Sequence, residues 1–148
     1  MAHARTTIRK AAVAILTAEV AITAPVLDNR VWYTPNTSLP VLGVYANSES
    51  IDLDQSSFDA DYRELELTIQ IIVEDQDGLS VADAADDLAE LVEKTLRADR
   101  TLGVNVQDVL APDTEATDDV TSEKVVRTLE LVFPVYYRTA PGNAGLII

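Results

Sequence analysis

The sequence contains no cysteine and a single histidine, His3. Without cysteine the chain has no disulfide, no thiolate metal ligand and no cysteine nucleophile. One histidine in an N-terminal segment that is expected to fray cannot build a Ser-His-Asp triad or a multi-histidine metal site within the chain. These absences argue against an enzyme, and we expect no catalytic residue, no cofactor and no metal site.

Basic residues are scarce, with 11 Lys and Arg against 25 Asp and Glu, which gives a formal charge of −14. Such a field repels nucleic acid phosphates and anionic membranes, so tight DNA binding is disfavoured. The sequence also has no apolar run of membrane-spanning length and no signal peptide. We therefore expect a soluble, cytoplasmic product.

The five glycines, at positions 43, 78, 103, 142 and 145, fit neither G-x-x-x-x-G-K-[ST] nor G-x-G-x-x-G, so neither phosphate-binding motif is present. The acidic pairs Asp52/Asp54 and Asp118/Asp119 could hold a hard cation or work as paired carboxylates. Loop acids at this density are mostly solvated charge. A hydrolase or small-ligand-binding domain is the alternative from another class, but no nucleophile, base and anion hole converge in the sequence.

The chain has 148 residues, 47% of them apolar, which suits one globular domain with one core. Two stretches have helical periodicity. The first, residues 7–19, has Thr6 or Thr7 as the expected N-cap. The second follows a turn at 75–78 and opens with a variant capping box, Ser80 with Asp83, and continues to Arg97. Their apolar faces contain Ile8, Ala11, Ala12, Ile15 and Leu16, and Val81, Ala84, Ala85, Leu88, Leu91, Val92 and Thr95.

Strand patterns fill most of the remaining sequence. Residues 62–73 alternate apolar and polar side chains, which is typical of a strand with one face in the core. Residues 124–137 form a second long strand, in which Pro134 requires either an edge or a bulge. Three shorter strands are also expected. They are the apolar run 41–46, the valine-containing segment 102–110, and the aromatic segment 31–33 at an edge of the sheet.

Two segments, 47–61 and 111–123, each contain five acidic residues and no basic one, and we expect both to be mobile loops. Residues 138–148 are expected to form a flexible C-terminal extension of a single domain that spans 1–137.

The two long strands would span about 40 Å, whereas the helix 80–97 would span about 27 Å. At least one of these strands must therefore extend beyond the helix that covers it. Its exposed backbone groups could then pair with a strand of another chain. Arg63 and Arg127 lie on apolar strand faces, where either a neighbouring subunit's carboxylate or an acidic loop of the same chain could pair with them. Trp32 and Tyr33 could form a subunit contact or a stacking platform for a base or sugar. The candidate subunit or partner interface comprises Trp32, Tyr33, Arg63, Arg127 and Tyr136.

Several stretches in this order are similar to the tail-terminator family of long-tailed (siphovirus-type) phages, typified by lambda's minor tail protein U. They are the first helix, the strand 28–33, the run Leu39-Pro40-Val41-Leu42-Gly43-Val44-Tyr45, the alternating Glu64-Leu65-Glu66-Leu67-Thr68-Ile69, the acidic second helix and the strand 128–137. The resemblance covers most of the chain. The segments 111–123 and 138–148 depart from the family pattern.

The resemblance implies an α+β fold, in which a mixed, mainly antiparallel twisted sheet of four to five strands has two helices packed on one face. It also implies a hexameric ring in the virion, at the head-proximal end of the tail. Such a ring docks on the tail tube, ends tube polymerisation and offers a surface for head–tail joining, while DNA passes through without specific binding. Its partners would be copies of itself, the major tail protein and a head–tail connector or completion protein. Another neck component is the nearest alternative.

Overall fold

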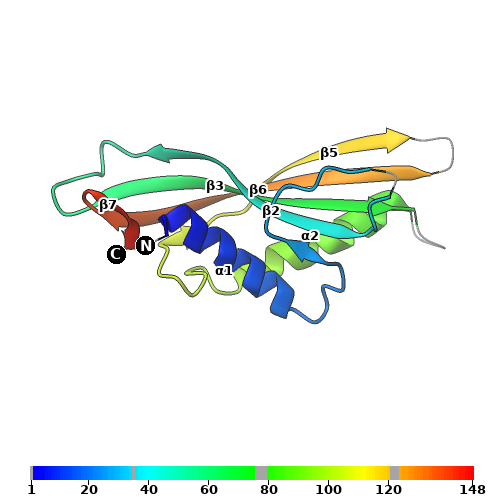
Figure 1. Ribbon diagram of the computed structural model, residues 1–148, viewed down its shortest axis with the longest axis horizontal. Helices are drawn as coiled ribbons and strands as arrows, with labels where there is room; N and C mark the ends of the chain where they lie inside the picture. The colour runs from blue at the N-terminus through cyan, green and yellow to red at the C-terminus, as the bar shows by residue number, and fades with distance from the viewer. Residues whose placement is uncertain (1, 35, 76–79, 121–123) are drawn as a thin grey trace.

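The computed structural model describes residues 2–34, 36–75, 80–120 and 124–148. In these residues two α-helices and a single sheet form an α+β fold, as the sequence predicts (Figure 1). The sheet has seven strands rather than four to five, because short strands join its edges. The elements are α1 (Ala4–Ala18), β1 (Val26–Leu27), β2 (Val41–Ile51), β3 (Asp61–Glu74), α2 (Val81–Arg97), β4 (Asp108–Val109), β5 (Asp113–Val120), β6 (Val125–Ala140) and β7 (Asn143–Ile147).

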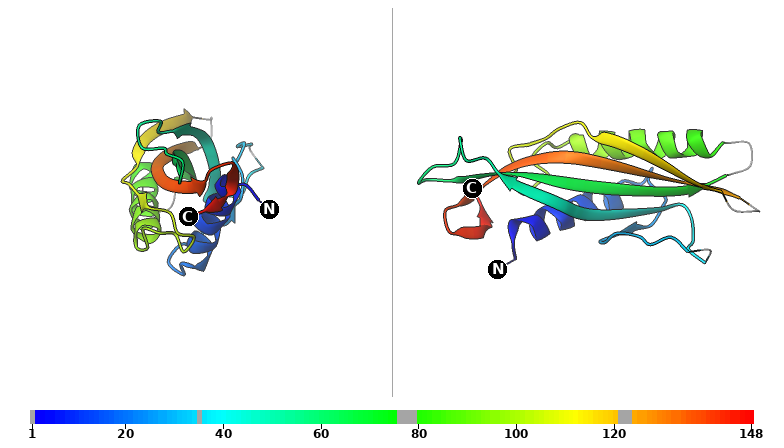
Figure 2. Two further views of the ribbon diagram at one scale, coloured as in Figure 1. Left: turned by 90° about the vertical axis from the view of Figure 1, so that its left-hand side faces the viewer. Right: turned by 90° about the horizontal axis from the view of Figure 1, so that it is seen from above.

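The centre of the sheet consists of the long antiparallel strands β2, β3 and β6. β1 pairs with β2 in parallel, and all other pairs are antiparallel, so the expected mixed, mainly antiparallel sheet is confirmed. Along its second side β6 pairs in turn with β5, β4 and β7. The sheet curls about its long axis (Figure 2), as twisted strands of this length do.

Pro134 lies in the middle of β6, where it pairs with Glu66 of β3 in an unbroken register. Its carbonyl accepts a hydrogen bond from the backbone N–H of Leu110 (3.0 Å) on the opposite side of the strand. On that side β4 ends at Val109 and β5 begins at Asp113, so the ladder is interrupted where proline has no N–H to donate. At Pro134, β6 therefore has no strand paired on this side, so the edge that the sequence allowed is present and the bulge is not.

Both helices pack on one face of the sheet, as expected (Figures 1 and 2). α1 contacts β2 and β7, and α2 contacts β3 and β6. The apolar spacing of each helix predicted the buried side, because residues three and four apart share a face. The members with no exposed surface are Ala4, Ile8, Ala12 and Leu16 of α1, Ala85, Val92 and Leu96 of α2, and Leu42, Val44, Leu65, Leu67, Ile69, Ile71, Val109, Phe133, Val135 and Tyr137 of the strands.

The caps of the two helices had different outcomes. Ser80 caps α2 through a hydrogen bond from the backbone N–H of Asp83 to its hydroxyl (3.2 Å), as predicted. The N-cap predicted for α1, Thr6 or Thr7, is wrong, since α1 begins at Ala4 and the Nδ1 atom of His3 accepts from the backbone N–H of Arg5 (3.1 Å). An imidazole nitrogen can accept where a hydroxyl was expected. His3 therefore has a structural role at the helix start.

Residues 31–33 do not form the strand that was expected. The edge strand beside β2 is instead β1, and it consists of Val26 and Leu27. Of the segment 102–110, only Asp108 and Val109 pair with β6. The turn expected at 75–78 lies largely outside the described residues, which resume at Ser80.

Both segments expected as acidic loops contain strand. β2 continues through residues 47–51, and Asp61 opens β3, so only 52–60 connect the two strands. Residues 113–120 form β5 because β6 offers an unpaired edge, and backbone pairing needs no apolar side chain. The expected flexible extension, 138–148, also differs: β6 runs to Ala140, and β7 folds back on it through a turn at Gly142, whose φ of +72° favours glycine.

No helix among the described residues is long and apolar enough to cross a membrane.

Candidate functional site

A side-chain clamp holds residues 29–31 against the sheet. The amide of Gln70 accepts from the backbone N–H of Val31 (2.9 Å) and donates to its carbonyl (3.1 Å). Gly43 allows this close approach, since a Cβ there would lie 2.7 Å from the carbonyl oxygen of Asn29. Val31 is therefore buried, and the flanking Arg30 and Trp32 are turned outward.

The outward side chains form a cluster that we call the aromatic corner: Arg30, Trp32, Tyr45 and Glu130. The guanidinium of Arg30 lies 4.4 Å from the ring centre of Trp32 and 5.7 Å from that of Tyr45, within the range of cation–π attraction. Glu130 forms an ion pair with Arg30 (3.8 Å) and accepts from the Tyr45 hydroxyl (3.3 Å). Burial and the carboxylate of Glu130 raise the pKa of Tyr45. Trp32 remains 73% exposed although its ring is stacked.

A shallow hollow of about 220 Å³ separates the aromatic corner from β5. Arg30 and Trp32 line one side, Thr117 of β5 lines another, and Thr128 and Glu130 of β6 contribute to the lining. Tyr33 also lines it, but its ring is half-buried against the small cluster of Val31, Val41, Ile72 and Val126. The hollow joins two features that the sequence analysis treated separately: an exposed aromatic side chain and a strand edge.

All eight residues of β5 are exposed. In the described part of the chain β5 pairs with β6 alone, so its outer edge presents unpaired backbone groups. Arg127 of β6 donates to Asp118 of β5 through Nε (2.6 Å) and Nη2 (2.9 Å). These bonds lower the pKa of Asp118. A two-point arginine contact thus helps to hold a strand that buries no side chain of its own.

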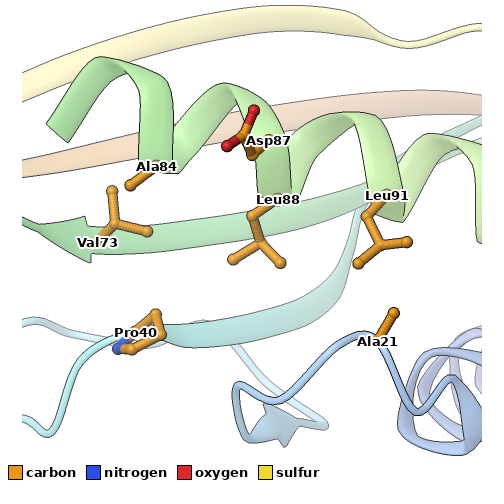
Figure 3. A pocket seen from close by; sticks show the side chains of 7 residues that line it. All are labelled: Ala21, Pro40, Val73, Ala84, Asp87, Leu88 and Leu91. Carbon is orange, nitrogen blue, oxygen red and sulfur yellow. The ribbon is translucent and has the colours of Figure 1, made fainter. Parts of the chain in front are cut away.

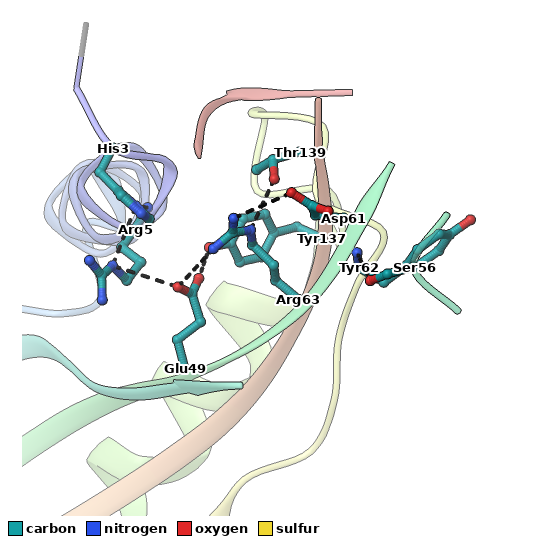
Figure 4. A network of polar contacts seen from close by, with 9 residues as sticks. All are labelled: His3, Arg5, Glu49, Ser56, Asp61, Tyr62, Arg63, Tyr137 and Thr139. Carbon is teal, nitrogen blue, oxygen red and sulfur yellow. Dashed lines mark hydrogen bonds and ion pairs between the residues drawn. The ribbon is translucent and has the colours of Figure 1, made fainter. Parts of the chain in front are cut away.

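Arg63 and Tyr136 lie at the opposite end of β3 and β6, far from the aromatic corner. Arg63 contacts Glu49 (3.3 Å) and Thr139 (2.9 Å), and Asp61 lies 3.8 Å away (Figure 4). Tyr136 lies on the other face of the sheet, and burial and then Glu64 raise its pKa. The five candidate interface residues therefore do not form one site.

Arg63 and Arg127 could have paired either with a neighbouring subunit or with an acidic segment of their own chain, and the structure shows the second. Each has a carboxylate partner within the chain: Glu49 for Arg63 and Asp118 for Arg127. Both carboxylates come from the two acidic segments, 47–61 and 111–123. Neither arginine therefore needs a neighbouring subunit's carboxylate.

Sequence reasoning missed Gln70, which is one of the polar residues in the alternating segment 62–73 but is only 5% exposed. The signal that could have found it is Gly43 in the middle of an apolar strand. A glycine in a strand interior often marks the close approach of another backbone, and that backbone requires a polar partner.

The arrangement shows little that would support acid–base chemistry. Among the described residues no group of acidic or histidine side chains could hold a metal ion. Asp99, Asp108 and Asp118 have lowered pKa values, because Thr101, Arg100 and Arg127 respectively donate to them. A general acid at neutral pH needs the opposite shift. What the surface offers is an aromatic ring, a strand edge and charge.

Comparisons with known proteins place the fold. No family model matches the chain, and no curated protein matches it. Solved structures do match, and one match is a chain of the virion of native gene transfer agent (GTA) particle. The two chains share a fold. The TM-score is 0.60 at 16% sequence identity, over 88% of this chain and 93% of that chain. The shared architecture thus covers nearly the whole of both chains.

Proposed function

We propose that this protein is a structural virion protein that caps the tail tube of a long-tailed phage or phage-like particle as a hexameric ring. The ring ends tube polymerisation and provides the surface for head–tail joining, and the protein is not an enzyme. The observation that carries the proposal is the fold shared with a chain of the gene transfer agent virion over almost the full length of both chains. The sequence resemblance to tail terminators points in the same direction.

Two surfaces are suited to ring formation. A closed ring needs heterologous contacts, in which one patch meets a different patch on the next subunit. Arg30 and Trp32 of the aromatic corner and Thr117 of β5 line the same hollow, so we assign the corner and the β5 edge to one contact surface. The matching surface is the outer edge of β2, which pairs with β1 only at Leu42 and Gly43.

The lengths and charges of the two edges support this pairing. β5 has eight residues, 113–120, and β2 beyond Gly43 also has eight, 44–51. β5 is acidic, whereas the acidic residue in 44–51 is Glu49, whose carboxylate is mostly buried by Arg63. Pairing the edges of neighbouring copies would extend the sheet around the ring without placing exposed carboxylates opposite each other.

The charge suits a ring that surrounds DNA. Each chain has a formal charge of −14, so six copies carry roughly −84. Acidic residues near the channel would keep passing DNA from adhering, since a duplex is attracted to basic surfaces.

Light-scattering mass measurements test ring formation. A hexamer of 16.1 kDa chains has a mass of about 97 kDa. Trp32→Ala should lower the mass while leaving the subunit folded, as circular dichroism would show, because Trp32 is largely exposed. Val20→Ser, which changes a 90% exposed residue after the end of α1 that belongs to neither proposed edge, is the matched control and should leave the mass unchanged. Co-sedimentation with purified tail tubes, compared with purified connector rings, then separates a tail terminator from another neck component.

A further inference from the structure

Three large apolar side chains are exposed in or beside the loop that joins β2 to β3, which we call the hairpin tip (residues 51–60). Phe58 is fully exposed (102%), Leu53 is 83% exposed, and Ile51 is 47% exposed. Single exposed apolar residues are ordinary, but three within eight residues at one extremity indicate a contact surface. The tip projects past the N-terminal end of α1 (Figures 1 and 2). Neither of the two helices in the described residues covers it.

The hairpin tip is built by its own hydrogen bonds. Oδ1 of Asp52 accepts from the backbone N–H groups of Asp54 (3.0 Å) and Gln55 (3.2 Å). The hydroxyl of Ser56 donates to the Asp52 carbonyl (2.7 Å) and accepts from the backbone N–H of Tyr62 (3.0 Å). A loop that is already ordered loses little conformational entropy when it binds. The tip therefore presents Leu53 and Phe58 in a prepared conformation.

A polar network at the base of the hairpin sets its direction (Figure 4). The mostly buried carboxylate of Glu49 accepts from the hydroxyl of Tyr137 and from Arg63 (3.3 Å). Arg63 also donates to Thr139 at the end of β6 (2.9 Å). Arg5 of α1 lies 3.8 Å from Glu49. The network ties the two strands of the hairpin to β6 and α1, so the tip is held as an extension of the sheet.

The charge of the tip identifies the kind of partner. Asp54 and Asp59 flank the apolar residues, and in the described structure their carboxylates make no hydrogen bond or ion pair. A surface of apolar side chains edged by carboxylates fits an apolar recess edged by Lys or Arg.

A second copy of the chain fits poorly. It does have an open apolar groove of about 210 Å³, where Leu88 and Leu91 of α2 point toward Ala21 and Pro40 (Figure 3). However, Asp87 lines this groove, and the neighbouring hollow adds Glu90 with a single base, Lys94. Seating the tip there would bring carboxylates of two chains together, each chain having a formal charge of −14.

We propose that the hairpin tip is the element that docks this protein onto a different virion protein, by inserting Phe58 and Leu53 into an apolar recess with a basic rim. The inference rests on the proposed function, which supplies the tail tube as the partner. Ring formation uses the sheet edges and the aromatic corner, and docking uses the tip.

Co-sedimentation with purified tail tubes tests the inference. Phe58→Ser should weaken binding by about 10- to 100-fold, the equivalent of losing the burial of one aromatic side chain. Leu146→Ser is the control, since Leu146 is an exposed apolar residue of β7 at the same end of the sheet. The Asp54→Asn/Asp59→Asn double variant should also weaken binding and flatten its dependence on salt. All variants should keep the wild-type melting temperature.

Each result separates the inference from the proposed function. If the wild-type chain binds tubes and Phe58→Ser binds them equally well, the inference is overturned while the tube-capping function stands. If Phe58→Ser instead lowers the mass of the ring in solution, a second copy is the partner and the inference is also overturned. If the wild-type chain does not bind tubes, the proposed function fails, and the inference fails with it.

Discussion

The clamp between Gln70 and residues 29–31 allows a quantitative test of how the aromatic corner is held. Replacing Gln70 with Leu keeps a similar volume but leaves the backbone N–H and carbonyl of Val31 without partners. An unpaired buried polar group costs about 1–3 kcal/mol, and the added apolar burial offsets part of that. If the segment 29–33 detaches from the sheet, water can hydrogen-bond to the N–H and carbonyl of Val31, and this limits the loss of folding free energy. We expect a loss of about 2–4 kcal/mol in the free energy of unfolding.

Urea denaturation measures that loss, and fluorescence reports the local change, since Trp32 is the only tryptophan of the chain. Detachment should separate Trp32 from Arg30 and shift its emission. Thr68→Val is a matched control on the same strand and face: Thr68 is 1% exposed, and its Oγ1 has no hydrogen-bond partner among the described residues. This substitution should be neutral or slightly stabilising. A Gln70→Leu variant within 0.5 kcal/mol of wild type, with unchanged Trp32 emission, would refute the clamp.

Three further outcomes follow from the same structure. Gly43→Ala should lower the free energy of unfolding by about 1–3 kcal/mol in urea, because its Cβ would lie 2.7 Å from the carbonyl oxygen of Asn29, and an unchanged value would contradict that contact. Glu49→Gln should cost about 2 kcal/mol by the same assay, since a mostly buried arginine loses its closest carboxylate; a change below 0.5 kcal/mol would show that the network is not needed. Arg127 lowers the pKa of Asp118, so this pair stabilises the fold above the unfolded value of about 3.9, and the contribution is lost as the pH falls through the lower folded value. Wild type should therefore melt above Asp118→Asn at neutral pH, with the gap closing below about pH 4; a gap that persists in acid would exclude the ionised pair as its cause.

Local patterns were enough to predict the core of the fold. The alternation in β3 and the helical spacing in α1 and α2 identified the buried faces, because these periods reflect backbone geometry alone. β5 was not predictable in this way, since none of its side chains is buried and only backbone pairing with β6 makes it a strand. His3 as a cap and Val26 with Leu27 as an edge strand were missed for a related reason: each depends on which segments meet in space.

Trp32 is exposed, and its role in a subunit or partner contact stays a prediction. The separation of Arg63 and Arg127 from each other, and the pairing of each with an acidic residue of its own chain, required the strand register. The hairpin tip escaped sequence reasoning because Leu53 and Phe58 sit in a segment whose carboxylates suggested an ordinary solvated loop.

Electron microscopy of tail tubes assembled with and without the protein tests the central claim most directly. The account predicts tubes that stop growing and carry a six-fold ring of this chain at one end. Tubes that elongate equally in its presence, with bare ends and the chain free in solution, would contradict it.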